Sequence, residues 1–206
     1  MSAMVKMVMA KFYQKAAGHP ERLPWHQEAP PHILTAAVAK RNGRGRALDV
    51  GCGAGVFTTW LAEQGMEVTG IDLFPEAAAM ARARAEQHHV KPELVVGDLF
   101  AYEPARPFDL VFDSGCLHSL VGGSVPAYKR KLLSWLAPGG DYVLGHWGKK
   151  HPFDWNPIGP RRRSQATIER TFAPELRLVD AEVKDFAVGM PFGKTVRGVG
   201  YWFQRR

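Results

Sequence analysis

The chain has 206 residues, of which 46% are hydrophobic and 23% are charged, and its formal net charge is +7. This length fits one α/β domain with a full core, and the composition is that of an ordinary soluble globular protein, which excludes a fibrous or largely disordered chain. Two cysteines give no disulfide framework, and no apolar run approaches the ~20 residues of a membrane span, so we expect a cytoplasmic protein with no membrane partner.

The positive charge does not by itself indicate a nucleic-acid partner. The basic residues are spread along the chain, with local clusters at residues 149–151, 161–163 and 205–206. A solvated surface or a small anionic substrate explains these clusters as well as a nucleic acid does. We therefore expect no nucleic-acid partner.

Residues 1–45 read as two helices joined by a proline-broken strap. The length and Ala/Met/Lys content of residues 4–17 predict a short amphipathic helix, and a second helix is expected over 32–41. The prolines of residues 19–31 exclude a long helix there. This strap contains Trp25 and His26, and either packs Trp25 onto the core or forms a lid over a ligand. A secretory signal peptide is not expected, because the long apolar core and cleavage site are missing.

Residues 46–55 carry the strongest local pattern in the chain. A short apolar run interrupted by Asp49 leads into Gly51, Gly53 and Gly55, and a helix is expected over 56–64. The pattern indicates a buried strand that turns sharply into a helix. Glycines at these positions allow positive φ and let the backbone come close to a bulky ligand, so we expect a nucleoside-containing cofactor here.

Strands and helices then alternate along the chain, which predicts a parallel, doubly wound sheet. The expected strands are 67–72, 93–98, 108–113 and 142–146, and the expected helices are 76–88 and 125–136, the latter ended by Ala-Pro-Gly-Gly. Ligands bind beyond the carboxyl ends of the strands in such sheets. Asp72, Asp98, Asp113 and His146 should therefore lie along one edge.

The remaining residues complete a single domain over 1–206. Residues 147–162 are rich in Gly, Pro and Trp and predict irregular structure. A helix is expected over 164–172 with Ser164 as its N-cap, followed by strands over 176–186 and 195–204. The expected organisation is an N-terminal part with the lid, a cofactor-binding core, a substrate-side insertion, and a C-terminal helix with a strand pair, at residues 1–45, 46–146, 147–163 and 164–206.

Five motifs in order resemble the class I S-adenosylmethionine-dependent methyltransferases. They are LDVGCGAG at 48–55, GIDL at 70–73, GDL at 97–99, FDLVFDSGCLH at 108–118 and LLSWLAPGGDYVL at 132–144. The resemblance covers roughly residues 46–146. It implies a Rossmann-like sheet of seven mostly parallel strands with an antiparallel last strand, helices on both faces, and S-adenosyl-L-methionine as the cofactor.

The resemblance also implies the cofactor-binding positions, which are Asp49, Gly51, Cys52, Gly53, Gly55, Asp72, Leu73, Gly97, Asp98, Leu99 and Asp113. By position, the glycines would let the backbone approach the methionine part, and Asp49 would help to hold its amino group. Asp72 would accept the ribose hydroxyls, and Asp98 with Leu99 would contact the adenine edge. Asp113 would lie where the methyl-bearing sulfonium meets the acceptor. The alternative role for each acid is a helix cap or a surface turn.

A nicotinamide-dependent dehydrogenase is the main rival with this fold. Its fingerprint spaces the glycines as G-x-G-x-x-G, whereas this loop is G-x-G-x-G followed by Val56. The chain also has no room for a separate catalytic domain. We therefore prefer the methyltransferase interpretation.

His118 is the best candidate for a general base, with Asp113 as the second expected catalytic residue. His118 follows the fourth strand in a loop that should face the cofactor, and an imidazole can take a proton at neutral pH. The alternative is a histidine that only packs or hydrogen-bonds. His146 and Trp147 form a weaker second position. Cys116 is expected to be a buried filler, and no metal site is expected because the other histidines have no ligand-like arrangement.

The acceptor is expected to be a small, enclosed ring compound and not a macromolecule. The fourth strand is not followed by the Asn-Pro-Pro-aromatic run of enzymes that methylate nucleic-acid bases. Aromatic walls could stack on a planar ring; the candidate wall residues are Trp25, Trp147, Phe153 and Trp155. The expected substrate-binding residues are Trp25, His26, His118, His146 and Trp147. Residues 24–31 also look like a segment of thiopurine and thiol methyltransferases, and residues 161–163 permit an anionic group on the acceptor.

The sequence therefore predicts a methyltransferase that modifies S, N or O of a small, aromatic or heterocyclic metabolite, as a monomer or homodimer. One alternative is an RNA or protein methyltransferase, which the positive charge would serve. The other is a non-catalytic, cofactor-binding partner subunit.

Overall fold

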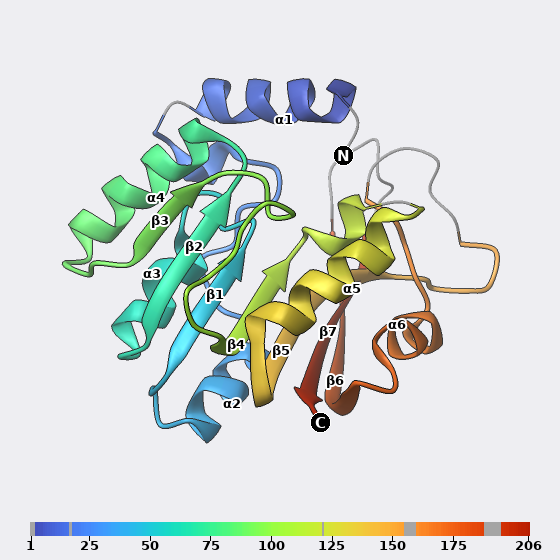
Figure 1. The fold of residues 1–206 in the computed structure, drawn as a ribbon. Coiled ribbons are helices and arrows are strands. Elements are labelled where there is room, and N and C mark those ends of the chain that lie inside the picture. The colour runs from blue at the N-terminus through green and yellow to red at the C-terminus, as the bar shows by residue number, and fades with distance from the viewer. Residues whose placement is uncertain (1–2, 17, 121, 155–159, 188–194) are drawn as a thin grey trace.

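A computed structural model describes residues 3–16, 18–120, 122–154, 160–187 and 195–206, and it contains a sheet of seven strands in the order β3-β2-β1-β4-β5-β7-β6. The strands are β1 (Arg46–Val50), β2 (Glu67–Asp72), β3 (Glu93–Val96), β4 (Phe108–Ser114), β5 (Leu136–Gly148), β6 (Leu176–Ala187) and β7 (Thr195–Arg205). All neighbouring strands from β3 to β5 pair in parallel, and β7 pairs antiparallel with both β5 and β6 (Figure 1). The predicted fold class is confirmed.

In the described part of the chain, six α-helices accompany these strands, and helices pack on both faces of the sheet. They are α1 (Ala3–Ala16), α2 (His32–Lys40), α3 (Val56–Glu63), α4 (Pro75–Gln87), α5 (Ser124–Trp135) and α6 (Gln165–Phe172). Short 3₁₀ turns lie at Pro20–Arg22 and Leu117–Ser119. Ser164 caps α6 as predicted, since its side chain accepts a hydrogen bond from the Thr167 amide at 3.2 Å.

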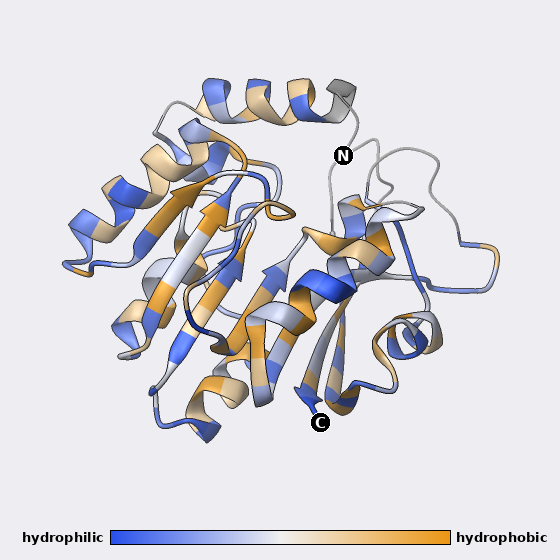
Figure 2. Cartoon of the chain, viewed as in Figure 1, coloured by the Kyte–Doolittle hydropathy of each residue, from blue (hydrophilic) through white to orange (hydrophobic). Residues whose placement is uncertain are grey.

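Two apolar layers hold the helices to the sheet. On one face, α2 and α3 pack on β1, β4 and β5 through residues such as Leu34, Leu61 and Phe112. On the other face, α5 and α6 pack on the same sheet through residues such as Trp135 and Phe172. Figure 2 shows hydrophobic residues along the strands and mixed hydrophobic and polar residues on the helices. Burial on both faces explains the nearly continuous apolar strands of the sequence.

Strand β5 is longer at both ends than the sequence indicates. It begins at Leu136, directly after α5, so the Pro-Gly-Gly segment lies inside the strand rather than before it. A shift in register accommodates these residues, because Phe108 of β4 pairs with Leu136 while Leu110 pairs with Asp141. At the other end, Trp147 is part of the strand and pairs with Gly198 of β7, so the predicted irregular segment starts two residues too early.

Helix α1 and the strap lie across the carboxyl end of the sheet, where the arrowheads of β1, β2 and β4 point (Figure 1). The Trp25 ring makes edge-to-face contacts with Phe12 at 5.5 Å and Tyr13 at 5.8 Å between ring centroids. The strap therefore packs onto α1 and not onto the sheet. In the described part of the chain, no helix has both the length and the apolar character that crossing a bilayer requires.

Candidate active site

The glycine loop between β1 and α3 has the backbone conformation that its sequence predicts. Gly51, Gly53 and Gly55 have φ values of +71°, +55° and +76°. The amides of Gly51 and Cys52 both donate to the Ile71 carbonyl, at 2.8 and 3.0 Å, which ties the loop to β2. A Cβ on Gly55 would lie 2.6 Å from the Cβ of Ala81. Glycine is therefore required for both the turn and the close packing of α4.

Asp72 at the end of β2 holds the glycine loop in place. One carboxylate oxygen accepts a hydrogen bond from the Gly53 amide at 2.9 Å, and the other accepts from the Phe74 amide at 3.0 Å. The residue is 6% exposed, and this burial raises the pKa of its carboxyl. Each carboxylate oxygen has a further lone pair, so the predicted ribose contact is compatible with these bonds.

Tyr13 of α1 lies close to the glycine loop and to the charge of Asp72, and sequence reasoning missed it. The residue is 4% exposed, its ring lies 5.5 Å from the Phe74 ring, and a Cβ on Gly53 would lie 3.3 Å from its hydroxyl oxygen. Burial, followed by the negative charge of Asp72, raises the pKa of Tyr13. The sequence contains no local signal for this contact, because Tyr13 and its partners are far apart along the chain.

The other predicted cofactor acids differ in their exposure. Asp49 is buried and accepts a hydrogen bond from the Thr58 hydroxyl of α3 at 2.6 Å, and burial raises the pKa of its carboxyl to about 7. Asp98 is exposed and accepts from the Phe100 amide at 3.0 Å in an Asx turn. The Gly97 amide donates to the Asp72 carbonyl at 2.9 Å, which places this turn beside the end of β2.

Asp113 holds the loop after β4 and has no exposed surface. Its oxygens accept hydrogen bonds from the amides of Cys116 at 2.7 Å and Leu117 at 3.0 Å and from the Tyr128 hydroxyl at 2.6 Å. Burial raises the pKa of this carboxyl to about 6. Both carboxylate oxygens are thus engaged by the protein itself, which does not favour the predicted direct catalytic contact. These bonds leave Asp113 to set the shape of residues 114–120.

His118 lies in that loop against the end of β5. Its ring centroid is 5.8 Å from that of His146 and 5.9 Å from that of Trp147. The Nδ1 atom is buried and has no hydrogen-bond partner within the described ranges. Burial, assisted by the positive charge of Arg163, lowers the pKa of His118 to about 4. The imidazole is therefore neutral near pH 7 and is a weak base.

His146 is occupied by the protein itself. Its Nε2 lies 2.8 Å from Nη1 of Arg163, and its Nδ1 lies 2.8 Å from the Trp147 carbonyl oxygen. Because arginine only donates, Nε2 must accept, so the proton is on Nδ1 and points to the carbonyl. Both ring nitrogens are used, which is at odds with the predicted substrate-binding role of His146.

The structure separates the predicted acceptor residues into two groups. His118, His146 and Trp147 meet at the end of β5, whereas Trp25 and His26 belong to the strap on α1. The His26 Nε2 atom lies 3.6 Å from a carboxylate oxygen of Glu28. Phe153 is 85% exposed and does not form a wall. Trp155, the fourth candidate wall residue, lies outside the described residues.

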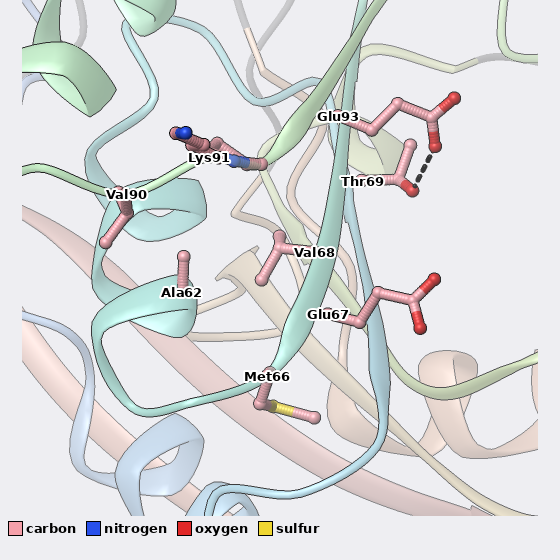
Figure 3. A pocket seen from close by; sticks show the side chains of 9 residues that line it. Ala62, Met66, Glu67, Val68, Thr69, Val90, Lys91 and Glu93 are labelled. Atoms are coloured by element: carbon pink, nitrogen blue, oxygen red, sulfur yellow. Dashed lines mark hydrogen bonds between the residues drawn. The ribbon is translucent and has the colours of Figure 1, made fainter.

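Two further observations concern metal binding and a pocket elsewhere on the molecule. Over the described ranges, no three His, Cys, Asp or Glu side chains are grouped closely enough to hold a metal ion. Figure 3 shows a separate surface pocket beside β2, lined on one side by Met66, Val68 and Val90, with a hydrogen bond of 2.8 Å from Thr69 to Glu93. This pocket contains none of the predicted site residues and begins at the amino end of β2.

S-adenosylmethionine fits the residues along the glycine-loop side of this edge. The three loop glycines present backbone without side chains, and a Cβ on Gly97 would meet no atom within 4 Å. The carboxylates of Asp72 and Asp98 flank that backbone and suit the hydroxyl and amino donors of a nucleoside. These residues would hold the cofactor, which supplies a methyl group activated by a positively charged sulfur.

Comparison with known proteins agrees with this fit. Residues 47–140 match the family described as "Methyltransferase domain". Over 141 residues, 60% of this chain, it is 32% identical to a thiopurine S-methyltransferase of Legionella pneumophila (strain Paris), of which 63% is covered. Over 137 residues, 63% of this chain, it is 34% identical to nodulation protein S of Rhizobium tropici, of which 56% is covered. The chain thus spans less than two thirds of the length of these relatives.

Among solved structures, the fold resembles that of 1,6-didemethyltoxoflavin-N1-methyltransferase from Burkholderia thailandensis. The TM-score is 0.72 at 21% identity, covering 100% of this chain and 91% of the other. That structure contains 1,6-didemethyltoxoflavin and S-adenosylhomocysteine. The glycine loop, the strand-end acids and the sheet order agree with this match, so residues 47–140 have both the sequence and the fold of a methyltransferase domain.

Proposed function

We propose that this protein transfers a methyl group from S-adenosylmethionine to a heteroatom of a small aromatic or heterocyclic metabolite. The observation that carries the proposal is the half-buried pair of His118, in the loop after β4, and Trp147, near the end of β5, on the same sheet edge as the glycine loop. An aromatic ring and a neutral imidazole at this place suit a planar acceptor with one polar atom.

The names of the similar proteins support a small heterocyclic acceptor. One relative is named for thiopurines, and one fold neighbour contains 1,6-didemethyltoxoflavin. The first is an S-methyltransferase and the second an N-methyltransferase, so the names leave the atom that is methylated open. Both names refer to a small heterocyclic compound.

Methyl transfer from a sulfonium is an in-line displacement, which requires alignment more than acid or base chemistry. Holding two reactants in a productive geometry can lower a barrier by about 7–11 kcal/mol. The loop that begins at Asp113 and contains His118 is held by the Asp113 carboxylate. This carboxylate accepts hydrogen bonds from the amides of Cys116 and Leu117 and from the Tyr128 hydroxyl. A loop held in this way is suited to fix an acceptor behind the methyl group.

The environment of His118 favours sulfur or nitrogen over phenolic oxygen as the acceptor atom. With a pKa of about 4, the imidazole can accept a hydrogen bond but is a poor acceptor for a proton. Each unit of pKa mismatch in a proton transfer costs about 1.4 kcal/mol, and a phenol has a pKa near 10. An acidic thiol that arrives ionised, or a ring nitrogen with a free lone pair, avoids that cost.

The proposal is tested by a screen with methyl-labelled S-adenosylmethionine. The panel contains heteroaromatic thiols, N-heterocycles and phenols, with bulk RNA and a protein mixture as macromolecular acceptors. We expect labelled product from a thiol or an N-heterocycle. Label only in RNA or protein, with transfer that falls steeply as salt increases, would overturn the proposal in favour of a macromolecular acceptor.

A further inference from the structure

Residues 161–163 run beside the loop that contains His118 and are bonded to it through the backbone. The Arg161 amide donates to the His118 carbonyl at 2.8 Å, and the Arg163 amide donates to the Trp147 carbonyl at 3.1 Å. Gly148 forms an isolated bridge with Arg163. This segment is therefore placed between the end of β5 and the loop after β4.

The Arg163 side chain binds the same two elements. Its Nη2 donates to the Leu120 carbonyl at 2.8 Å, and its Nη1 donates to the Leu117 carbonyl at 3.3 Å and to Nε2 of His146 at 2.8 Å. Leu117 and Leu120 flank His118 in sequence. The planar guanidinium can reach three acceptors at once because its donors have a fixed fork geometry, which an ammonium group lacks.

The half-buried Arg163 side chain bonds to neutral groups in the part of the chain that the structure describes. Within the described residues, no carboxylate lies within ion-pair distance of its guanidinium, whereas the adjacent Arg162 pairs with Asp154 at 2.5 Å. Two carbonyl oxygens and an imidazole nitrogen take the place of an acid. The contacts of Arg163 therefore serve the placement of a loop and not the neutralisation of a charge.

We infer that Arg163 is a positioning residue for methyl transfer, which holds the His118 loop against the end of β5 and makes residues 161–163 part of the acceptor side. The inference rests on the proposed function, since it gives His118 a place next to the acceptor. Arg163 acts through the backbone of Leu117 and Leu120 and through His146, and it need not touch the acceptor.

Kinetics of Arg163→Lys and Arg163→Met test the inference with an acceptor from the screen. The lysine keeps the charge but cannot span the three acceptors. We expect kcat to fall about tenfold in both variants, the size expected for loss of the His118 contact itself, with the Kd for S-adenosylmethionine within about twofold of the original protein. Unchanged kcat in folded Arg163→Lys, or an equal loss of cofactor affinity, would overturn the inference.

Arg205→Lys is the matched control for simple loss of stability. The Arg205 guanidinium also bonds two carbonyl oxygens, those of Leu133 and Leu136, but at the opposite end of the sheet. We expect this variant to lower Tm by an amount comparable to that in Arg163→Lys and to leave kcat unchanged. If Arg205→Lys lowers kcat as much, the effect of Arg163 is merely one of stability and the inference is wrong.

Nitrogen NMR of the imidazoles gives a readout that needs no acceptor. We expect the original protein to show His146 with its proton on Nδ1. In Arg163→Met, the His118 resonance should shift and its pKa should rise, because a nearby positive charge is removed, while Arg163→Lys should shift the resonance and keep the pKa low. A His118 signal that is the same in all three proteins would overturn the inference even if no acceptor were found.

Discussion

The two sides of the carboxyl edge are built in different ways. On the cofactor side, the backbone makes the main contacts, as when the Gly51 and Cys52 amides bond to Ile71 of the neighbouring strand. On the acceptor side, side chains hold the loop: Asp113 at its start, and Arg163, from a distant segment, along its length. The comparison indicates that changes on the cofactor side should affect folding and cofactor affinity, and changes on the acceptor side should affect turnover.

The largest effect is expected from Gly55→Ala on the cofactor side. The new Cβ would lie 2.7 Å from the Ala81 Cα in a backbone with a φ of +76°. The left-handed conformation and the overpacking together should cost about 2–4 kcal/mol of unfolding free energy. Urea unfolding measures this loss, and calorimetry should show much weaker cofactor binding.

Gly123→Ala is the control for Gly55→Ala. Gly123 has a φ of −63°, and a Cβ there meets no atom within 4 Å. Its unfolding free energy should stay within about 0.5 kcal/mol of the original value. Equal stability of the two alanine variants would contradict the requirement for glycine in the loop.

The next effect is expected from Asp72→Ala, which should weaken S-adenosylmethionine binding by about tenfold to a hundredfold. The change removes a charged acceptor of the kind whose hydrogen bonds contribute about 1.5–3 kcal/mol each. It also frees the Gly53 amide, to which the carboxylate is bonded. Titration calorimetry measures the affinity, with exposed Asp98→Ala expected to show a smaller loss. An unchanged Kd in Asp72→Ala would remove the ribose assignment.

His118→Ala is the corresponding change on the acceptor side, and its expected effect is smaller. Turnover should fall about tenfold, below the usual range for a general base, because an imidazole with a pKa of about 4 serves mainly to position the acceptor. Cofactor affinity should stay within twofold or so. Initial rates from about pH 6 to 9 check this, and turnover that is unaffected throughout would exclude a role for His118.

The cofactor side could be predicted from the sequence because its requirements are local. Three glycines with positive φ and an acid at a strand end occupy short stretches, so Gly51–Gly55 and Asp72 read directly as a loop and its partner. The start of β5 could not be read in this way. Pro-Gly-Gly is typical of a turn, and only the register shift opposite Phe108 shows that the strand absorbs it.

The acceptor side could be predicted only in part, because its contacts join segments that are far apart along the chain. His118 and Trp147 are both among the predicted substrate-binding residues, and their ring centroids lie 5.9 Å apart. The position of Tyr13 near the glycine loop and Asp72 has no local signal, nor has the bond from Arg163 to His146. Because of that bond, Nε2 of His146 is already occupied and is not available to an acceptor. No sequence pattern around His146 could predict this.

In the pH dependence of stability, the two sides should have opposite signs. Burial raises the pKa of Asp49 from 3.8 to about 7, so the folded state binds more protons than the unfolded state between these values, and stability contributed by this group falls as pH rises. Burial lowers the pKa of His118 from 6.5 to about 4, so the unfolded state binds more protons, and stability rises with pH over that window.

Asp49→Asn and His118→Asn should therefore change the pH dependence of the unfolding free energy in opposite directions. Relative to the original protein, the unfolding free energy of Asp49→Asn should increase with pH between about 4 and 7, because the variant lacks the cost of ionising a buried carboxyl. That of His118→Asn should decrease between about 4 and 6.5, because the variant lacks the gain from releasing a proton. Urea unfolding at a series of pH values measures both slopes. Slopes of the same sign would show that burial does not act oppositely on these two groups, and the neutral state assigned to His118 would then be wrong.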